Sequence, residues 1–178
     1  KGTGERDYAL LYVNSALDNK PMPAKFPTLR FNTDLMWTSA ENSAVTATGY
    51  PAQKLVEEGI DAVIVPKTAS TTITELMTFG SNYADIFTIG GSVVGEQGSS
   101  GGPVVDQNNN VIGMIVTRGD DEAFGEGSLR ALSLSYIDRT ITEETGFPLW
   151  RNLSGDLPYR AKLYKDTMIP FLETILSW

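Results

Sequence analysis

The chain has 178 residues, of which 41% are hydrophobic, so it is long enough for a medium-sized domain with a buried core and is not generally disordered. Its net charge of −8 disfavours nucleic acid and anionic membrane surfaces as partners, and no apolar run reaches the roughly 18 residues of a membrane span. Because the sequence has no cysteine, no disulfide can form. Because it has neither cysteine nor histidine, carboxylates would be the side chains available to bind a metal. We expect no metal site and no cofactor.

The first part of the chain alternates short apolar runs with turn residues. Asp7 opens an apolar run that predicts a strand over residues 7–13, and a proline-containing connector follows over residues 14–31. Short strands at intervals of roughly ten residues predict an all-β barrel or sandwich. The further strands are predicted over 31–37, 44–50, 61–66, 70–79 and 85–90, with a turn or short helical turn over 54–59.

A serine-containing glycine loop, Gly98-Ser99-Ser100-Gly101-Gly102, follows these strands. Glycines permit backbone angles closed to other residues, and they let successive N–H groups point into one concavity that can hold a developing negative charge. Ser100 in such a loop is placed as a nucleophile beside an oxyanion hole. The alternative is a glycine-rich hairpin turn with an incidental serine.

The residues after the loop separate two classes of serine enzyme. The pattern G-x-S-x-G also marks the nucleophile elbow of α/β-hydrolases, which needs a helix directly after the serine. Here Gly101-Gly102-Pro103 cannot begin a good helix, and two apolar runs, 104–105 and 111–116, flank a turn over 106–110. This pattern predicts a β-hairpin and excludes the hydrolase elbow.

The C-terminal part changes from strand to helix patterns. Residues 136–145 suit a short helix that ends at Gly146, and residues 163–176 form a second helical pattern with Pro170 as a kink or restart. We expect its apolar face to pack on the preceding barrel, with a docking or oligomerisation helix as the alternative. The residues of this face are Leu163, Ile169, Leu172, Ile175 and Leu176.

At the glycine loop the sequence resembles the trypsin/chymotrypsin-like serine peptidases, whose signature is G-[DN]-S-G-G-P, with Ser99 where Asp or Asn is usual. Residues 113–119 resemble the family's strand that pairs with the substrate main chain. Residues 45–51 are similar to a strand end of the bacterial branch with HtrA-like and glutamyl-endopeptidase enzymes, and residues 129–137 to its last strand and terminal helix. The run from Asp7 is similar to the segment whose Asp orients the catalytic histidine. The matches follow the family's order, so a structural β-domain with a chance glycine loop is the least favoured interpretation.

The resemblance implies an all-β, chymotrypsin-like double β-barrel with an incomplete first barrel, a complete second barrel and C-terminal helices. We expect residues 1–30 to contain the end of the first barrel and the connector between barrels. Residues 31–137 would form the second barrel with the nucleophile, and residues 138–178 a helical tail. The resemblance also implies a secreted or extracytoplasmic location, such as the bacterial periplasm.

The resemblance further implies a serine endopeptidase in which Ser100 is the nucleophile and Asp7 orients the histidine. The backbone N–H groups of Gly98 and Ser100 would form the oxyanion hole. Because the family's order is His, Asp, Ser and this chain lacks histidine, we expect a C-terminal portion of a longer protease, inactive alone. Its partners would be a polypeptide substrate and the missing N-terminal part of its own protein. The alternative is a catalytically dead protease-like module that binds peptides by strand addition at Thr117 to Gly119.

The same resemblance outlines a specificity pocket with Val94 at its base. Its walls would be Thr117, Arg118 and Gly119 on one side and Gly127 on another. Because Val94 is apolar, a medium-sized apolar P1 residue is favoured over Arg or Lys. An acidic substrate at Arg118 is less favoured, because the glutamyl-specific relatives use a pocket histidine that this chain lacks.

Overall fold

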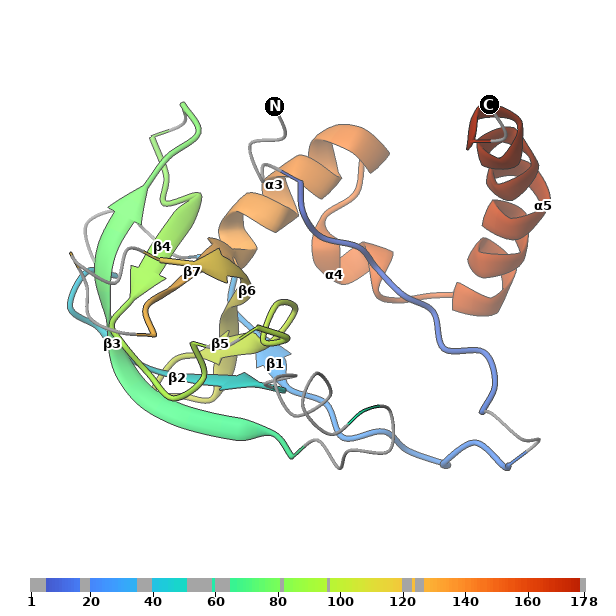
Figure 1. Cartoon of the computed structure of the whole chain (residues 1–178). Helices are drawn as coiled ribbons and strands as arrows, with labels where there is room; N and C mark the ends of the chain where they lie inside the picture. Colours follow the sequence, from blue (N-terminus) through green and yellow to red (C-terminus); the bar gives the residue numbers. More distant parts are fainter. Residues whose placement is uncertain are drawn as a thin grey trace.

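The chain forms a β-barrel followed by three helices (Figure 1). The computed structural model describes residues 6–16, 20–34, 40–50, 59, 65–80, 82–95, 97–119, 123 and 127–176. The strands are β1 (Arg30–Phe31), β2 (Ala44–Gly49), β3 (Lys67–Met77), β4 (Ile86–Ile89), β5 (Pro103–Val105), β6 (Asn110–Arg118) and β7 (Leu129–Ser133). The helices are α3 (Leu134–Thr145), α4 (Leu149–Asn152) and α5 (Leu157–Leu176).

Six strands close into a ring in the order β6-β5-β2-β3-β4-β7, because β7 pairs with β6 as well as with β4. Every pairing within this ring is antiparallel. The seventh strand, β1, pairs in parallel with the start of β6, at Asn110 and Val111, before β7 takes over that edge of β6 at Gly113. The predictions of a complete barrel and of C-terminal helices are both confirmed.

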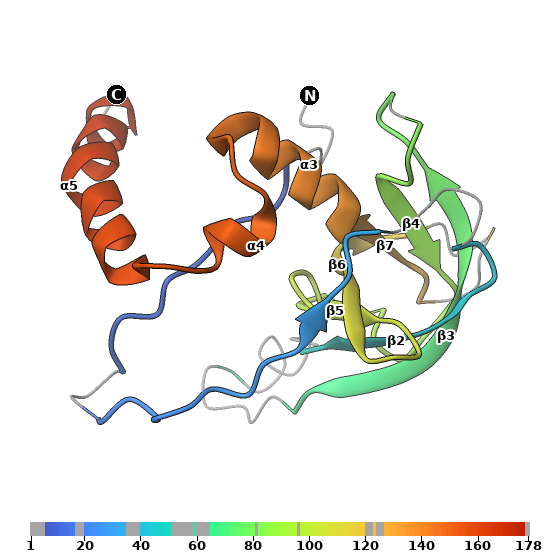
Figure 2. The same cartoon turned by 180° about the vertical axis from the view of Figure 1, so that it is seen from behind.

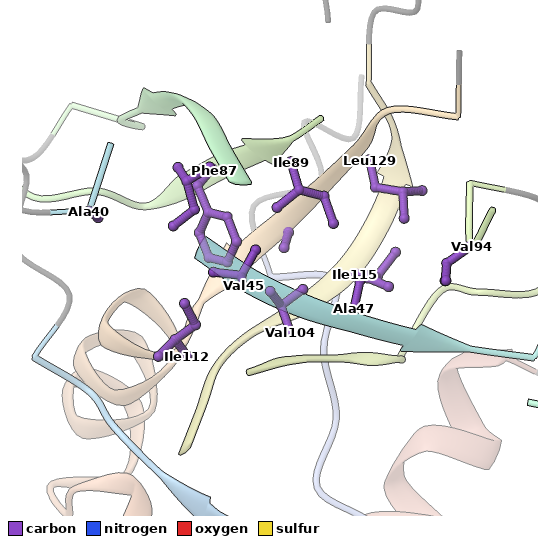
Figure 3. Packing of buried hydrophobic residues seen from close by; sticks show 12 residues of the cluster. Ala40, Val45, Ala47, Phe87, Ile89, Val94, Val104, Ile112, Ile115 and Leu129 are labelled. Atoms are coloured by element: carbon purple, nitrogen blue, oxygen red, sulfur yellow. The ribbon is translucent and has the colours of Figure 1, made fainter. Parts of the chain in front are cut away.

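Alternation along the strands fills the barrel interior. In β2, Val45 and Ala47 are buried while their neighbours are partly exposed, as expected when successive side chains point to opposite faces. The Phe87 ring is fully buried and packs over Gly113, where a Cβ atom would lie 2.4 Å from the ring. Figure 3 shows the labelled core side chains converging between the strands. The core residues are Ala40, Val45, Ala47, Ile73, Phe87, Ile89, Val94, Val104, Ile112, Ile115, Leu129 and Ala131.

The turn between β5 and β6 is organised by Asp106. Its Oδ1 accepts hydrogen bonds from the backbone N–H groups of Asn108 at 2.8 Å and Asn110 at 2.9 Å, and its Oδ2 from the Asn110 amide at 3.2 Å. Partial burial acts to raise the pKa of Asp106, but the hydrogen bonds from Asn110 and Asn108 outweigh it, so the pKa is lowered from its ordinary value. Asn109 takes a left-handed φ of +59°, which asparagine tolerates well.

Helix α3 is capped at both ends and is held on the barrel by a partly buried ion pair. The Ser133 hydroxyl caps its N-terminus by accepting from the Tyr136 N–H, and Gly146 ends it with a φ of +74°. Arg139 of α3 forms an ion pair with Asp85, which is 1% exposed and also accepts hydrogen bonds from Thr78 and Phe79. Apolar residues beneath α3 form a second cluster, and its buried members are Leu132, Leu134, Tyr136, Ile137, Ile141 and Leu149.

Several predicted elements need correction. Residues 7–13 form no strand; in the described residues no strand lies beside them to accept their hydrogen bonds, and Leu11 stays 87% exposed. The strand expected over 31–37 is observed only as Arg30–Phe31, and residues 35–39 lie outside the described residues, as do 51–58 and 60–64 of the predicted turn and strand. The short helix α4 was not predicted. The domain limits at 30 and 137 stay predictions.

The second predicted helix exists but does not pack on the barrel. It begins at Leu157 rather than 163, continues through Pro170, and has no buried residue. Both Figure 1 and Figure 2 show α5 standing apart from the barrel, beyond α4. The expectation that its apolar face covers the barrel is therefore wrong. In the described part of the chain, no helix is both long enough and apolar enough to cross a membrane.

Candidate active site

The glycine loop between β4 and β5 presents one serine and buries the other. Gly98 and Gly101 have φ values of +96° and +85°, a left-handed conformation that favours glycine. Between them, Ser99 is 1% exposed and points inward, whereas Ser100 is exposed in a turn. The loop therefore offers the hydroxyl of Ser100, and not that of Ser99, to an incoming molecule.

Backbone hydrogen bonds fix this turn to the barrel. The Gly101 N–H donates to the Ile115 carbonyl at 2.8 Å, and the Ile115 N–H donates to the Gly102 carbonyl at 2.9 Å. The Gly102 N–H donates to the Ser99 carbonyl at 3.0 Å, which closes the turn around Ser100. A Cβ atom on Gly102 would lie 2.2 Å from the Thr48 carbonyl oxygen, so β2 approaches too closely for any other residue. These contacts explain why the turn needs its glycines.

Two backbone N–H groups and one hydroxyl belong to this turn. The N–H groups of Gly98 and Ser100 donate to no other residue that the structure describes. The Ser100 hydroxyl donates a long hydrogen bond of 3.3 Å to the Val116 carbonyl of β6. Main-chain N–H groups beside a hydroxyl can stabilise the negative charge that develops when a carbonyl carbon is attacked. This chemistry requires no metal, and no group of acidic residues in the described ranges is arranged to hold one.

The side chain of Ser99 points inward and is tightly packed. A Cβ atom on Gly49 would lie 2.6 Å from the Ser99 hydroxyl oxygen and 2.9 Å from Val94. The Ser99 Oγ atom is buried and makes no hydrogen bond in the described structure. Ser99 and Val94 therefore leave no room for a side chain at position 49. This packing could not be predicted from the local sequence pattern.

The predicted walls of the specificity pocket come together beside the turn. The Ser92 N–H donates to the Gly127 carbonyl at 3.2 Å, and Gly95 approaches Gly127 so closely that a Cβ atom would lie 2.1 Å from its oxygen. The Gly119 N–H donates to the Ser128 carbonyl at 2.8 Å. These contacts make neighbours of three segments, namely the loop before the serine, the end of β6 and the start of β7.

The predicted pocket base and the remaining wall residues are placed as follows. Val94 is fully buried and belongs to the barrel core (Figure 3). Thr117 and Arg118 pair with Arg130 and Leu129 of β7. The side chain of Arg118 lies outside the described part of the structure. The assignment of these residues to a substrate pocket stays a prediction.

Asp7 lies on an N-terminal arm, residues 6–16, that is attached to α3. Arg6 forms an ion pair with Glu144, and the Tyr8 hydroxyl lies 2.5 Å from the Thr140 hydroxyl. Asp7 itself is exposed and makes no hydrogen bond to Ser100 or to any other described residue. The structure thus fixes both neighbours of Asp7 on α3 but does not join its carboxylate to the serine turn.

An apolar pocket of about 270 Å³ connects the arm with the serine turn. Tyr8, Ala9 and Leu10 of the arm line it together with Gly101 and Pro103, which lie one and three residues after Ser100. The arm therefore shares a cavity with the turn even though Asp7 does not contact it. No local pattern in the sequence predicted this pocket, because its lining comes from distant segments. The other lining residues are Leu29, Phe31, Val111, Gly113, Met114, Leu134, Ile137, Leu149 and Leu153.

A comparison with solved structures found several proteins of low sequence identity to this chain. Among solved structures, the chain is similar to the Rv3671c protease of M. tuberculosis H37Rv in an inactive form, with 20% identity, a TM-score of 0.46, and coverage of 71% of this chain and 56% of that chain. It is also similar to a Glu endopeptidase in complex with MPD, with 16% identity, a TM-score of 0.41, and coverage of 65% and 46%. A third similar structure is a variant of the HtrA-type protease AlgW with a decapeptide, with 18% identity, a TM-score of 0.41, and coverage of 67% and 34%.

The sequence comparison identifies the family. The chain spans little more than half of the Rv3671c protease and less of the other two proteins. No curated protein matches the sequence. The family described as trypsin-like peptidase domain matches residues 2–114, which is more than half of the chain and includes the serine turn. The chain therefore belongs to the trypsin-like peptidase family.

Proposed function

We propose that this chain carries the nucleophile of a serine endopeptidase that cleaves polypeptides through an acyl-enzyme. The observation that carries the proposal is the exposed hydroxyl of Ser100, held in a turn between the left-handed glycines Gly98 and Gly101. The unused N–H groups of Gly98 and Ser100 lie in the same turn and would bind the oxyanion of the tetrahedral intermediate. Each such donor is typically worth about 3 kcal/mol in the transition state.

The proton of Ser100 needs a base that this sequence does not contain. In the proposed mechanism Ser100 Oγ attacks the peptide carbonyl carbon, and an imidazole takes the hydroxyl proton and later gives it to the leaving amine. Asp7 would hold that imidazole in the correct tautomer. Since the chain has no histidine, we propose that the imidazole comes from a further part of the same protein. Losing the base costs on the order of a million-fold in rate, so the chain alone is expected to be inactive.

The substrate would bind as an extended strand along the end of β6. Thr117, Arg118 and Gly119 would pair with its main chain, and Val94 and Gly127 would border the P1 site, which favours a medium-sized apolar side chain. Support comes from the proximity of these loops to the turn, since Ser100 donates to the Val116 carbonyl of the same strand. An extracytoplasmic location is part of the same proposal.

The proposal is tested with a serine-reactive phosphonate probe on two proteins, the isolated chain and the same chain with its natural upstream segment. We expect no labelling of the isolated chain and clear labelling of the longer protein at Ser100. Ser100→Ala should abolish the labelling and reduce peptidase activity about a million-fold. Ser99→Ala, which removes the neighbouring buried hydroxyl, should leave both unchanged. Labelling of the isolated chain would contradict the missing-base mechanism, and an unlabelled longer protein would contradict the peptidase assignment.

A catalytically dead peptide-binding module is the second candidate. The observation that favours it is that the sequence contains no histidine at all. Met114 is the last residue of β6 that pairs with a residue of β5. Strand β6 continues from there to Arg118, and this continuation would pair with an added peptide strand. In this case the longer protein would bind extended peptides in a calorimetric titration without cleaving them or reacting with the probe.

A further inference from the structure

Helix α5 is well formed, but no element in the described part of the chain covers it. The Asp156 side chain caps its start by accepting from the Tyr159 N–H at 3.0 Å, and Arg160 donates to the Arg151 carbonyl at 3.1 Å. Yet none of the residues of α5 is buried, and both views show it apart from the barrel (Figures 1 and 2). Most of the stability of a helix in a protein comes from packing an apolar face against a neighbour, and α5 has no such packing in the described structure.

Six apolar residues of α5 form a stripe with alternating spacings of four and three residues, while Leu163, Ile169 and Leu176 lie outside it. This spacing is the heptad repeat, which keeps apolar residues on the side that faces a partner helix. Lys162, Asp166 and Glu173 lie on the opposite side of the helix. The stripe differs from the face predicted from the sequence, of which it shares only Ile175. The stripe, here called the seam, consists of Leu157, Ala161, Tyr164, Met168, Phe171 and Ile175.

We propose that the seam of α5 pairs with the seam of α5 in a second copy of this chain, with the two helices antiparallel. Turning one copy about an axis at Asp166 brings Tyr164 of one copy against Met168 of the other. The same rotation brings the small Ala161 against the large Phe171 of the second copy. Leu157 then meets Ile175 at each end. A small side chain thus faces a large one, as close packing between two helices requires.

The parallel arrangement of two copies fits less well. It would set Ala161 against Ala161 and Phe171 against Phe171, leaving a gap in one layer and crowding in another. It would also bring Arg160 beside Lys165 of the second copy at both flanks, and like charges there repel. In the antiparallel arrangement Arg160 lies beside Thr174, and the one like-charge contact is between the two Lys165 side chains. Salt screens that contact, so the association should strengthen as salt is added.

The first test compares two adjacent residues of equal exposure, one in the seam and one outside it. Met168 is 40% exposed and Ile169 is 38% exposed, but the Ile169 side chain points away from the seam. At chain concentrations up to about 100 µM, chosen because so small an interface binds weakly, sedimentation equilibrium should show a monomer–dimer equilibrium. Met168→Lys should raise the dissociation constant at least about tenfold and Ile169→Lys less than about twofold, because a charge in the seam would be buried. Far-ultraviolet circular dichroism at a concentration where both are monomeric should show equal helicity.

The second test fixes the orientation by cysteine cross-linking, for which the chain has no competing cysteine. A mixture of the Ala161→Cys and Phe171→Cys variants should form a mixed disulfide dimer on mild oxidation. Neither variant alone should, because like positions lie roughly 15 Å apart along antiparallel helices. Cross-linking of Ala161→Cys with itself would overturn the antiparallel arrangement. A chain that stays monomeric, or that Met168→Lys and Ile169→Lys affect equally, would overturn the seam.

Discussion

The barrel and the segments outside it use the same apolar residue types with opposite outcomes. Inside the ring, Phe87 and Ile89 are fully buried, because six strands pair on both edges and enclose them. In the N-terminal arm Leu11 is 87% exposed, and in α5 Phe171 is 57% exposed. The barrel thus buries its own apolar side chains, whereas the arm and α5 leave apolar side chains exposed. Matched substitutions in the two regions test this distinction.

The largest contrast is expected from the same substitution, phenylalanine to alanine, in the two regions. Phe87→Ala leaves a cavity among core residues and should lower the free energy of unfolding by about 4 kcal/mol. Phe171→Ala removes no buried contact within the chain and should change it by less than about 0.5 kcal/mol when measured at a concentration too low for association. Urea unfolding followed by tryptophan fluorescence and circular dichroism measures both. Equal losses in the two variants would show that α5 packs on the barrel in solution.

A second contrast comes from two ion pairs that both involve α3. Asp85, 1% exposed, pairs with Arg139 on the barrel side, whereas Glu144 and Arg6 form an exposed pair that holds the arm. Asp85→Asn leaves the Arg139 guanidinium without its counter-charge and should destabilise the chain by about 3 kcal/mol. Glu144→Gln should cost less than about 0.5 kcal/mol, since exposed pairs contribute little.

Limited proteolysis sharpens this second comparison. Glu144→Gln should expose the arm to cleavage near residues 6–16 while the barrel stays intact. Asp85→Asn should instead increase cleavage throughout the chain, because it loosens the contact between α3 and the β3–β4 pair. If Asp85→Asn proved as mild as Glu144→Gln, the buried pair would not be what docks α3 on the barrel.

The smallest effect is expected at the turn of the barrel's own hairpin. Asp106→Ala removes three hydrogen bonds at a partly exposed site and should cost about 1 kcal/mol at neutral pH. Because folding lowers the pKa of Asp106, its carboxylate stabilises the fold above the unfolded-state pKa, and this contribution is lost as the pH falls through the folded-state pKa. The stability difference between wild type and variant should therefore be constant near pH 7 and narrow below about pH 4. A difference that persisted unchanged in acid would assign the effect to something other than the charge.

The sequence predicted those parts of the fold that local patterns determine. The hairpin over 103–118 and the serine turn follow from glycines, a turn rich in Asp and Asn, and alternating apolar residues, all within one short segment. The prediction of a strand over 7–13 was wrong because a strand also needs a neighbouring strand to pair with. The local sequence pattern does not show whether such a neighbour exists. The start of α5 was missed because the helical pattern was recognised only from Leu163; the observed helix begins at Leu157 and includes Pro158 in its first turn, where proline is tolerated.

The sequence predicted which residue types form the candidate site, but not which of their side chains are buried. The family signature pointed to Ser100 as the nucleophile, but the sequence did not predict that Ser99 would be buried. Ser99 packs against Gly49, which lies far away in the sequence. Val94 is similar, because an apolar residue can line a pocket or fill a core, and the sequence did not reveal that Val94 is fully buried in the barrel core. Its place beside the P1 site stays a proposal. The 270 Å³ pocket between the arm and the turn likewise arises from segments that only the fold brings together.

The long hydrogen bond from Ser100 to the Val116 carbonyl has a consequence for how such a site would rest between turnovers. At 3.3 Å it holds the hydroxyl proton loosely, and replacing it by another acceptor should cost no more than about 1 kcal/mol. The Val116 carbonyl would thus compete only weakly with an approaching base for the proton of the Ser100 hydroxyl. If a substrate strand donated a hydrogen bond to the same carbonyl, the Ser100 hydroxyl would lose its acceptor. Substrate binding would then leave the hydroxyl able to turn toward a base.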